Sequence, residues 1–145
     1  MKPLRAITLG FLALLFLYAG LDKAFHYGGF VKALDGYVLV PHGAGPHLAL
    51  PLLACELLVG VGLLVRPWQP AAVRVATVLL ALFTVALAVN QRYAPGAECG
   101  CWFTLTVSRA TTSHIAQDLV LLALAVGLWV EERKATSTTD IVRRS

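Results

Sequence analysis

Charged residues are scarce in this sequence. Only 8 Asp and Glu residues and 12 Lys and Arg residues occur among 145, which makes 14% of the chain charged, whereas a soluble domain has about a quarter. The hydrophobic share is 58% and the mean hydropathy is +0.74. This composition excludes an ordinary soluble domain and indicates one integral membrane domain. Basic residues in such a protein set its topology, so we read no nucleic-acid partner from the net charge of +4.

Sustained period-2 alternation, internal repeats and low-complexity tracts are also missing. Four segments are instead apolar on every face, at about 6–21, 48–65, 71–89 and 115–130. A helix crosses a bilayer with about 17 to 25 residues, and flanking residues such as Leu4 and Ser113 can lengthen the two shorter segments. Because barrel strands alternate, we predict an all-α membrane protein, a four-transmembrane-helix bundle over residues 1–130. The polar tail at 131–145 is expected to be disordered.

The distribution of Lys and Arg predicts the orientation. The first segment ends in Leu17-Tyr18-Ala19-Gly20, which lacks a small-x-small cleavage pattern, so we expect it to remain as a helix. With the N-terminus inside, eight basic residues lie inside and four lie outside. The outer four are Lys23, Lys32, Arg92 and Arg109. The positive-inside rule therefore predicts that both termini are cytoplasmic.

The two outer connections, 22–47 and 90–114, are long, and loops of roughly 25 residues are usually functional or partly structured. The first contains apolar residues at helical spacing, namely Phe30, Ala33, Leu34, Tyr37 and Val38. This spacing predicts a short interfacial helix that ends before Pro41.

Cysteine is rare, with three residues in all, and two of them form Cys99-Gly100-Cys101 in the second outer connection. Alternate residues place their Cα atoms about 5.5 to 7 Å apart, near the upper limit for a disulfide. Gly100 allows the backbone angles that closure needs. A strained bridge over so short a loop stabilises the fold little and exchanges readily, which favours redox chemistry over a structural clip or two idle thiols.

Several polar residues lie in or beside the apolar segments. Glu56 is eight residues into the second segment, about 12 Å along a helix and close to the bilayer midplane, where an acid predicts a functional site. Asp22, Lys23, Asn90 and Asp118 all fall near the outer ends of segments. They can converge into one polar cavity that opens outward. The alternative is that they act as interfacial caps and that Glu56 is protonated or hydrogen-bonded between helices.

The remaining chemical candidates are Cys55 and the histidines. Cys55 is either a small core residue or a resolving thiol for the outer pair. Soft thiolates and imidazoles together suit copper or zinc, but the spacing matches no metal motif, so we predict no metal site. The histidines concerned are His26, His42, His47 and His114.

A set of short motifs resembles the MauE branch of the DoxX-like membrane proteins over about the first 130 residues. These motifs are Tyr18-Ala19-Gly20-Leu21-Asp22-Lys23, Phe30, Val40-Pro41, Leu50-Pro51, Glu56-Leu57-Leu58-Val59-Gly60, Asn90 and Cys99-Gly100-Cys101-Trp102. Phe103 departs from the pattern, in which a small residue is expected. The resemblance implies a small four-helix protein of the bacterial cytoplasmic membrane, associated with redox processes. It points to Lys23, Glu56, Cys99 and Cys101 as the functional residues.

In that branch, the founding member belongs to methylamine utilisation and is implicated in producing a disulfide-rich periplasmic subunit. The leading hypothesis is thus a membrane thiol-disulfide oxidoreductase that uses Cys99 and Cys101, with Lys23 favouring the thiolate and Glu56 relaying a proton. Its electrons would pass to a periplasmic thioredoxin-like or disulfide-containing protein, or to a quinone held in the bundle. A non-catalytic scaffold for a redox partner and, more remotely, a metal carrier are the alternatives.

Overall fold

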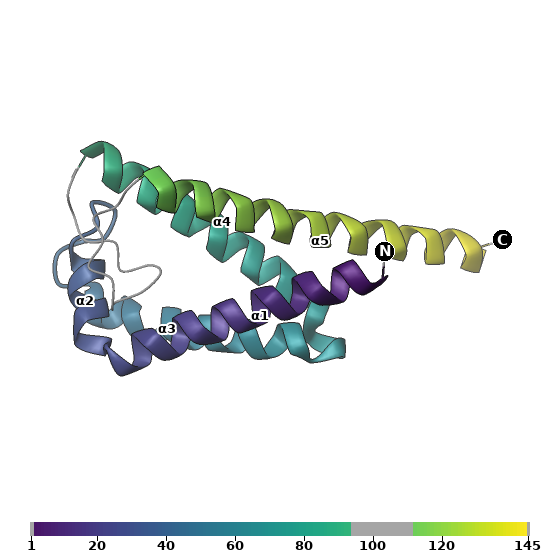
Figure 1. Ribbon diagram of the computed structural model, residues 1–145, viewed down its shortest axis with the longest axis horizontal. Helices are drawn as coiled ribbons and strands as arrows, with labels where there is room; N and C mark the ends of the chain where they lie inside the picture. The colour runs from purple at the N-terminus through teal and green to yellow at the C-terminus, as the bar shows by residue number, and fades with distance from the viewer. Residues whose placement is uncertain (1, 94–111, 145) are drawn as a thin grey trace.

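The computed structural model describes residues 2–93 and 112–144, and this part of the chain is helical with no strands (Figure 1). Its elements are α1 (Lys2–Phe25), α2 (Tyr27–Asp35), α3 (Gly45–Leu64), the short 3-10 turn η1 (Arg66–Trp68), α4 (Gln69–Tyr93) and α5 (Thr112–Arg144). Cys99, Cys101 and Phe103 lie outside the described residues, as do Trp102 and Arg109.

The apolar segments of the sequence correspond to the long helices. Three helical stretches are long and apolar enough to cross a membrane, namely Pro3–Phe25, Gly45–Leu64 and Arg66–Tyr93. The expected fourth segment, 115–130, lies within α5, but its crossing of the membrane stays a prediction. α2 confirms a short helix in the first long connection, and Phe30, Ala33 and Leu34 on it are buried as their spacing predicts. The helix ends at Asp35, so Tyr37, which is buried, and Val38, which is 51% exposed, lie beyond it, and the interfacial position stays a prediction.

The tail differs from expectation, because α5 continues as a helix to Arg144. The prediction of disorder after residue 130 is therefore wrong for the backbone. Glu131, Glu132, Arg133 and Lys134 are good helix formers, and adding residues to an existing helix avoids the unfavourable step of nucleation.

The helices form two antiparallel pairs. α1 packs mainly on α3, α4 packs mainly on α5, and contacts between α3 and α4 join the pairs. α1 begins and α5 ends at the same end of the molecule, and α2 lies at the opposite end (Figure 1). That both termini lie on one side of the membrane, and that this side is cytoplasmic, stays a prediction.

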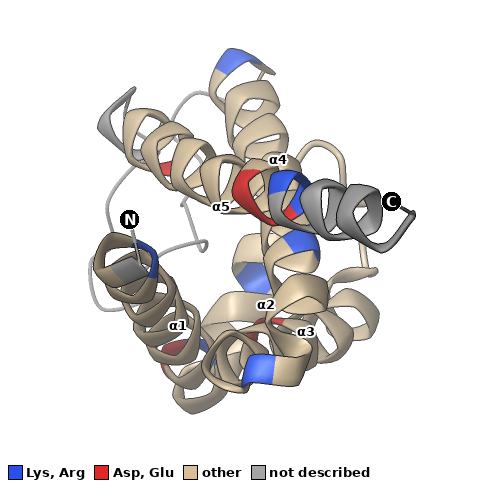
Figure 2. Cartoon of the chain, turned by 90° about the vertical axis from the view of Figure 1, so that its right-hand side faces the viewer, with Lys and Arg blue, Asp and Glu red and all other residues tan. Residues whose placement is uncertain are grey.

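The centre of the bundle is a cluster of buried apolar side chains from α1, α3, α4 and α5, including Leu12, Phe16, Leu63, Val73 and Ala125. Many large apolar residues point outward instead. Ile7, Leu14 and Leu58 are each 67–68% exposed, as expected of side chains that contact lipid. Figure 2 shows how few charges interrupt these helices.

α1 and α3 approach each other closely at two glycines. A Cβ atom added to Gly20 would lie 2.7 Å from the side chain of Leu57. One added to Gly60 would lie 2.7 Å from the side chain of Leu17 and 3.1 Å from its backbone nitrogen. A leucine of the other helix thus packs against each glycine. Small residues allow this close packing between membrane helices.

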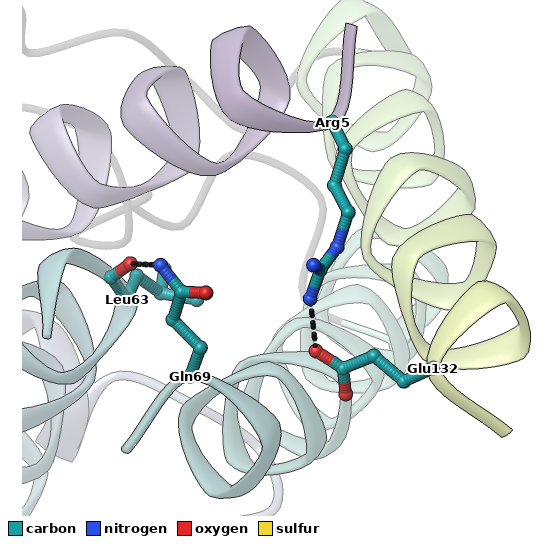
Figure 3. Close-up of polar contacts among 4 residues, drawn as sticks. All are labelled: Arg5, Leu63, Gln69 and Glu132. Atoms are coloured by element: carbon teal, nitrogen blue, oxygen red, sulfur yellow. Dashed lines mark hydrogen bonds and ion pairs between the residues drawn. The ribbon is translucent and has the colours of Figure 1, made fainter. Parts of the chain in front are cut away.

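Polar contacts link the helices at the end of the molecule where α1 begins (Figure 3). The guanidinium of Arg5 in α1 donates to Glu132 in α5 at 2.9 Å. The amide of Gln69 at the start of α4 donates to the backbone carbonyl of Leu63 at 3.1 Å and stabilises the turn between α3 and α4. This end is therefore tied together by contacts from four helices.

Candidate functional site at the buried lysine and glutamate

Lys23 and Glu56 form an ion pair inside the bundle. The Lys23 Nζ donates to both carboxylate oxygens of Glu56, at 2.8 Å to Oε1 and 2.9 Å to Oε2. Lys23 is 2% exposed and Glu56 is 1% exposed, although 33 residues separate them in the sequence. Because an unpaired charge is costly in a dry interior, each residue makes the burial of the other tolerable.

The glycine contacts between α1 and α3 bring this pair together. Lys23 follows Gly20 by three residues on α1, and Glu56 precedes Gly60 by four on α3. Residues three or four apart share one face of a helix, so both side chains lie on the faces that approach each other. The two glycines therefore set the separation at which Lys23 reaches Glu56.

Two aromatic rings complete the surroundings of the ammonium. The Nζ of Lys23 lies 5.5 Å from the ring centroid of Phe30 in α2 and 5.9 Å from that of Phe83 in α4. The face of a phenyl ring attracts a cation at such distances. Side chains from α1, α2, α3 and α4 thus converge on one positive charge.

A hydrogen bond between side chain and backbone positions α2 for this contact. The carboxylate of Asp35, the last residue of α2, accepts from the backbone N–H of Gly45 at the start of α3, at 2.8 Å. Gly43 in the intervening turn has a φ of 83°, a conformation that favours glycine. This link holds α2 against α3 and keeps Phe30 over the ammonium.

An apolar cavity of about 510 Å³ lies beside the pair. Lys23 is the only charged residue that lines it among the described residues, and the walls come from α2, α3, α4 and the turn after α2. Its volume is typical of a site for a small ligand. The site is therefore a largely apolar space with one ammonium group in its wall.

Cys55 lines the same cavity. It is partly buried, forms no disulfide among the described residues, and also packs against the central apolar cluster. The structure thus shows Cys55 as a packed residue beside the cavity, whereas its use as a resolving thiol for Cys99 and Cys101 stays a prediction.

Asn90, Asp22 and Asp118 are all buried but do not line the cavity. The backbone N–H of Val38 donates to the Asn90 side-chain oxygen at 3.2 Å, which fastens the turn after α2 to the end of α4. The ring of His26 contacts Asp22, with Nδ1 3.3 Å from the carboxylate, at the break between α1 and α2. A single outward polar cavity formed by these residues stays a prediction.

The structure therefore unites Lys23, Glu56 and Cys55 of the predicted set, whereas Cys99 and Cys101 lie outside the described residues. Sequence reasoning missed Phe83. A signal was present, because Phe83 precedes Asn90 by seven residues, two helical turns, on one face of α4. In the part of the chain that the structure describes, no three His, Cys, Asp or Glu residues are grouped as metal ligands.

Taken together, the apolar helices and the buried pair beside a cavity define a multi-pass helical membrane protein with an intramembrane polar site. The family model described as "Methylamine utilisation protein MauE" matches residues 1–131, and the chain belongs to this family.

Two curated relatives carry the name methylamine utilization protein MauE. The one from Paracoccus denitrificans is 35% identical over 119 residues, which cover 81% of this chain and 64% of the relative. The one from Paracoccus versutus is 33% identical over 118 residues, which cover 81% of this chain and 63% of the relative. The chain thus matches slightly less than two thirds of each relative's length. No solved structure matches the chain.

Proposed function

We propose that this protein is a thiol-disulfide redox protein of the bacterial cytoplasmic membrane, with a role of the methylamine-utilisation type in the maturation of a disulfide-containing partner. The observation that carries the proposal is the buried Lys23–Glu56 pair beside Cys55 and an apolar cavity. Paired charges inside a membrane protein mark candidate functional sites, because burying a charge there is costly. Membership of the MauE family supports a role of the methylamine-utilisation type.

In the proposed reaction, a thiolate of the partner attacks one sulfur of a Cys99–Cys101 disulfide. The S–S bond breaks, and a mixed disulfide and one free thiolate form. A second thiolate of the partner then attacks the mixed disulfide, so the partner leaves with a new disulfide and Cys99 and Cys101 remain as a dithiol. Two electrons have moved from the partner to this chain, and they leave to a thioredoxin-like protein or a quinone.

This role requires four membrane crossings. With both termini cytoplasmic, α2 and residues 94–111 lie on the outer side, where an oxidising compartment permits disulfides. The excess of Lys and Arg on the side of the termini supports this orientation. Lys32→Cys and Arg66→Cys, each made in a chain without its three native cysteines, test it by labelling with a membrane-impermeant maleimide in intact cells. Only the cysteine at position 32 should react.

Trapping of thiols tests the redox role. Cells are treated with a mass-tagged maleimide before and after mild reductant, and the oxidation states of Cys99 and Cys101 are determined by gel shift and peptide mapping. We expect both cysteines to change state together, and Cys99→Ser to abolish maturation of the partner. Cysteines that never change state, or full activity of Cys99→Ser, would contradict the proposal.

A non-catalytic scaffold is the second candidate. The apolar side chains of Val38 and Leu39, which are 51% and 56% exposed, offer a contact surface at the end of the bundle where α2 lies. Recovery of partners with a Cys99→Ala/Cys101→Ala variant separates the two functions. A retained partner together with a retained phenotype favours the scaffold, whereas a retained partner with a lost phenotype favours redox chemistry.

A further inference from the structure

The cavity beside Lys23 is lined in part by exposed apolar side chains of helices that are long and apolar enough to span a membrane. Its lining includes Leu48 of α3 and Leu82 of α4, which are 44% and 59% exposed. On a helix bundle that crosses a bilayer, exposed leucines of this kind contact lipid. An occupant therefore enters from the bilayer and is itself apolar over most of its surface.

The polar end of the cavity offers one hydrogen-bond donor. A lysine ammonium has three N–H donors, and Lys23 uses two on the carboxylate of Glu56. Among the described residues the third has no hydrogen-bond acceptor, although the ring centroids of Phe30 and Phe83 lie 5.5 and 5.9 Å from Nζ. Because a buried donor without a partner is unfavourable, a ligand with a hydrogen-bond acceptor at this end would be stabilised.

The charges select a neutral acceptor. Glu56 already balances the positive charge of Lys23, so an anionic headgroup would bring a second negative charge close to the carboxylate. A carbonyl oxygen accepts a hydrogen bond without that repulsion. Phe30 and Phe83, whose rings flank the ammonium, also line the cavity and present surfaces against which a flat ring can pack.

We propose that this cavity binds the head ring of a membrane quinone. Nζ of Lys23 donates to one ring carbonyl, the ring packs against the phenylalanines, and the isoprenoid tail leaves past the exposed leucines into the bilayer. The inference deepens the proposed redox function by naming the class of electron acceptor, and its role in turnover rests on that function. In that role the quinone takes up two electrons and two protons from a dithiol and leaves as the quinol, and the dithiol becomes a disulfide.

The test is photolabelling of the full chain in phosphatidylcholine nanodiscs with an azidoquinone, followed by peptide mapping. We expect label on peptides of α2, α3 or α4 that line the cavity, and its loss when excess decylubiquinone competes. Decanoate, which has a chain of similar length and an anionic head, should not compete. Label that decylubiquinone does not displace, or that decanoate displaces equally well, overturns the proposal, and the second outcome assigns the cavity to a fatty acyl chain.

Two matched variants on α4 locate the binding. Ala86 lines the cavity, whereas Ala88, two residues away, is exposed on the outer face. Since overpacking of a filled site costs about 1 to 3 kcal/mol, Ala86→Phe should reduce competed labelling about tenfold or more, and Ala88→Phe should leave it unchanged. Equal labelling of the two variants would place the quinone elsewhere.

A third variant removes the donor without leaving an unpaired charge. Lys23→Met/Glu56→Met should weaken labelling about tenfold or more, because a hydrogen bond from a charged donor is lost. Undiminished labelling of this variant contradicts the assigned contact even if Ala86→Phe does not fold.

Labelling needs no thiol, so it is measured also in Cys99→Ser/Cys101→Ser. If decylubiquinone displaces the label but Cys99 and Cys101 of the wild type never change their oxidation state, only the redox function is refuted. If these cysteines do change their oxidation state but decylubiquinone displaces no label, only the quinone site is refuted.

Discussion

The ammonium of Lys23 is held 2.8 and 2.9 Å from the two carboxylate oxygens of Glu56, with both side chains excluded from solvent. Removal of one partner leaves the other charge buried and unpaired. Lys23→Met should therefore destabilise the fold by about 3 to 5 kcal/mol, whereas Lys23→Met/Glu56→Met should recover most of that loss. Thermal unfolding in detergent measures both, with the exposed Lys32→Met as control. A double variant as unstable as the single one would show that the pair does not act as a unit.

The close contact of α1 and α3 predicts opposite effects of one substitution at two glycines. Gly60→Ala places a Cβ 2.7 Å from the side chain of Leu17 and 3.1 Å from its backbone nitrogen, so the helices must separate, at about 1 to 3 kcal/mol. Gly10→Ala meets nothing within 4 Å and should gain up to about 1 kcal/mol from helix propensity.

Unfolding midpoints of the two variants and of the wild type decide this prediction. A midpoint of Gly60→Ala equal to or above that of the wild type would mean that the α1–α3 contact tolerates a methyl group at Gly60, and that the separation of these helices is not what sets the Lys23–Glu56 distance.

Much of this fold could be predicted from composition and periodicity. The apolar segments and the helix around Phe30 follow from local patterns, because a bilayer demands internally paired backbone and the 3.6-residue period reports a buried face. The Lys23–Glu56 contact joins residues 33 positions apart, and it depends on which helix faces meet. The sequence motifs name both residues as candidates, but only packing at Gly20 and Gly60 explains how they meet.

The cavity that the structure shows is lined mostly by apolar side chains, whereas the expected polar cavity stays a prediction. Asp22, Asn90 and Asp118 share an end of the bundle with Lys23, yet a cavity is defined by the apolar side chains that fail to fill it. The packing and the rotamers of these apolar side chains depend on the tertiary arrangement. Sequence spacing can therefore place polar residues at one depth without showing which of them a ligand can reach.

The hydrogen bond between Asn90 and Val38 predicts that a substitution of Asn90 destabilises the turn after α2 locally. Its side-chain oxygen accepts from the backbone N–H of Val38, so Asn90→Ala leaves that donor without its partner and should destabilise the turn by about 1 to 2 kcal/mol. Hydrogen exchange measured by mass spectrometry should show faster exchange in the peptide that contains Val38. The control is Arg92→Ala, at an exposed position two residues after Asn90. In this variant, hydrogen exchange of the same peptide should match that of the wild type.

Cys55 provides a direct probe of the cavity. In Cys99→Ser/Cys101→Ser it is the single thiol of the chain, and it lines the cavity beside Lys23. A small apolar maleimide should modify it faster than a charged, membrane-impermeant one, because access is from the bilayer. Decylubiquinone at about ten times its Kd should slow the modification about tenfold, since the rate follows the fraction of empty cavities.

The same measurement with Ala86→Phe added separates protection in the cavity from a change in the surrounding lipid. If the quinone binds in the cavity, addition of decylubiquinone should leave the modification rate of Cys55 unchanged in the variant with Ala86→Phe, because the phenyl ring of residue 86 already fills the site. Equal slowing with and without Ala86→Phe would mean that the quinone acts through the lipid phase, and the cavity would then have no part in quinone binding.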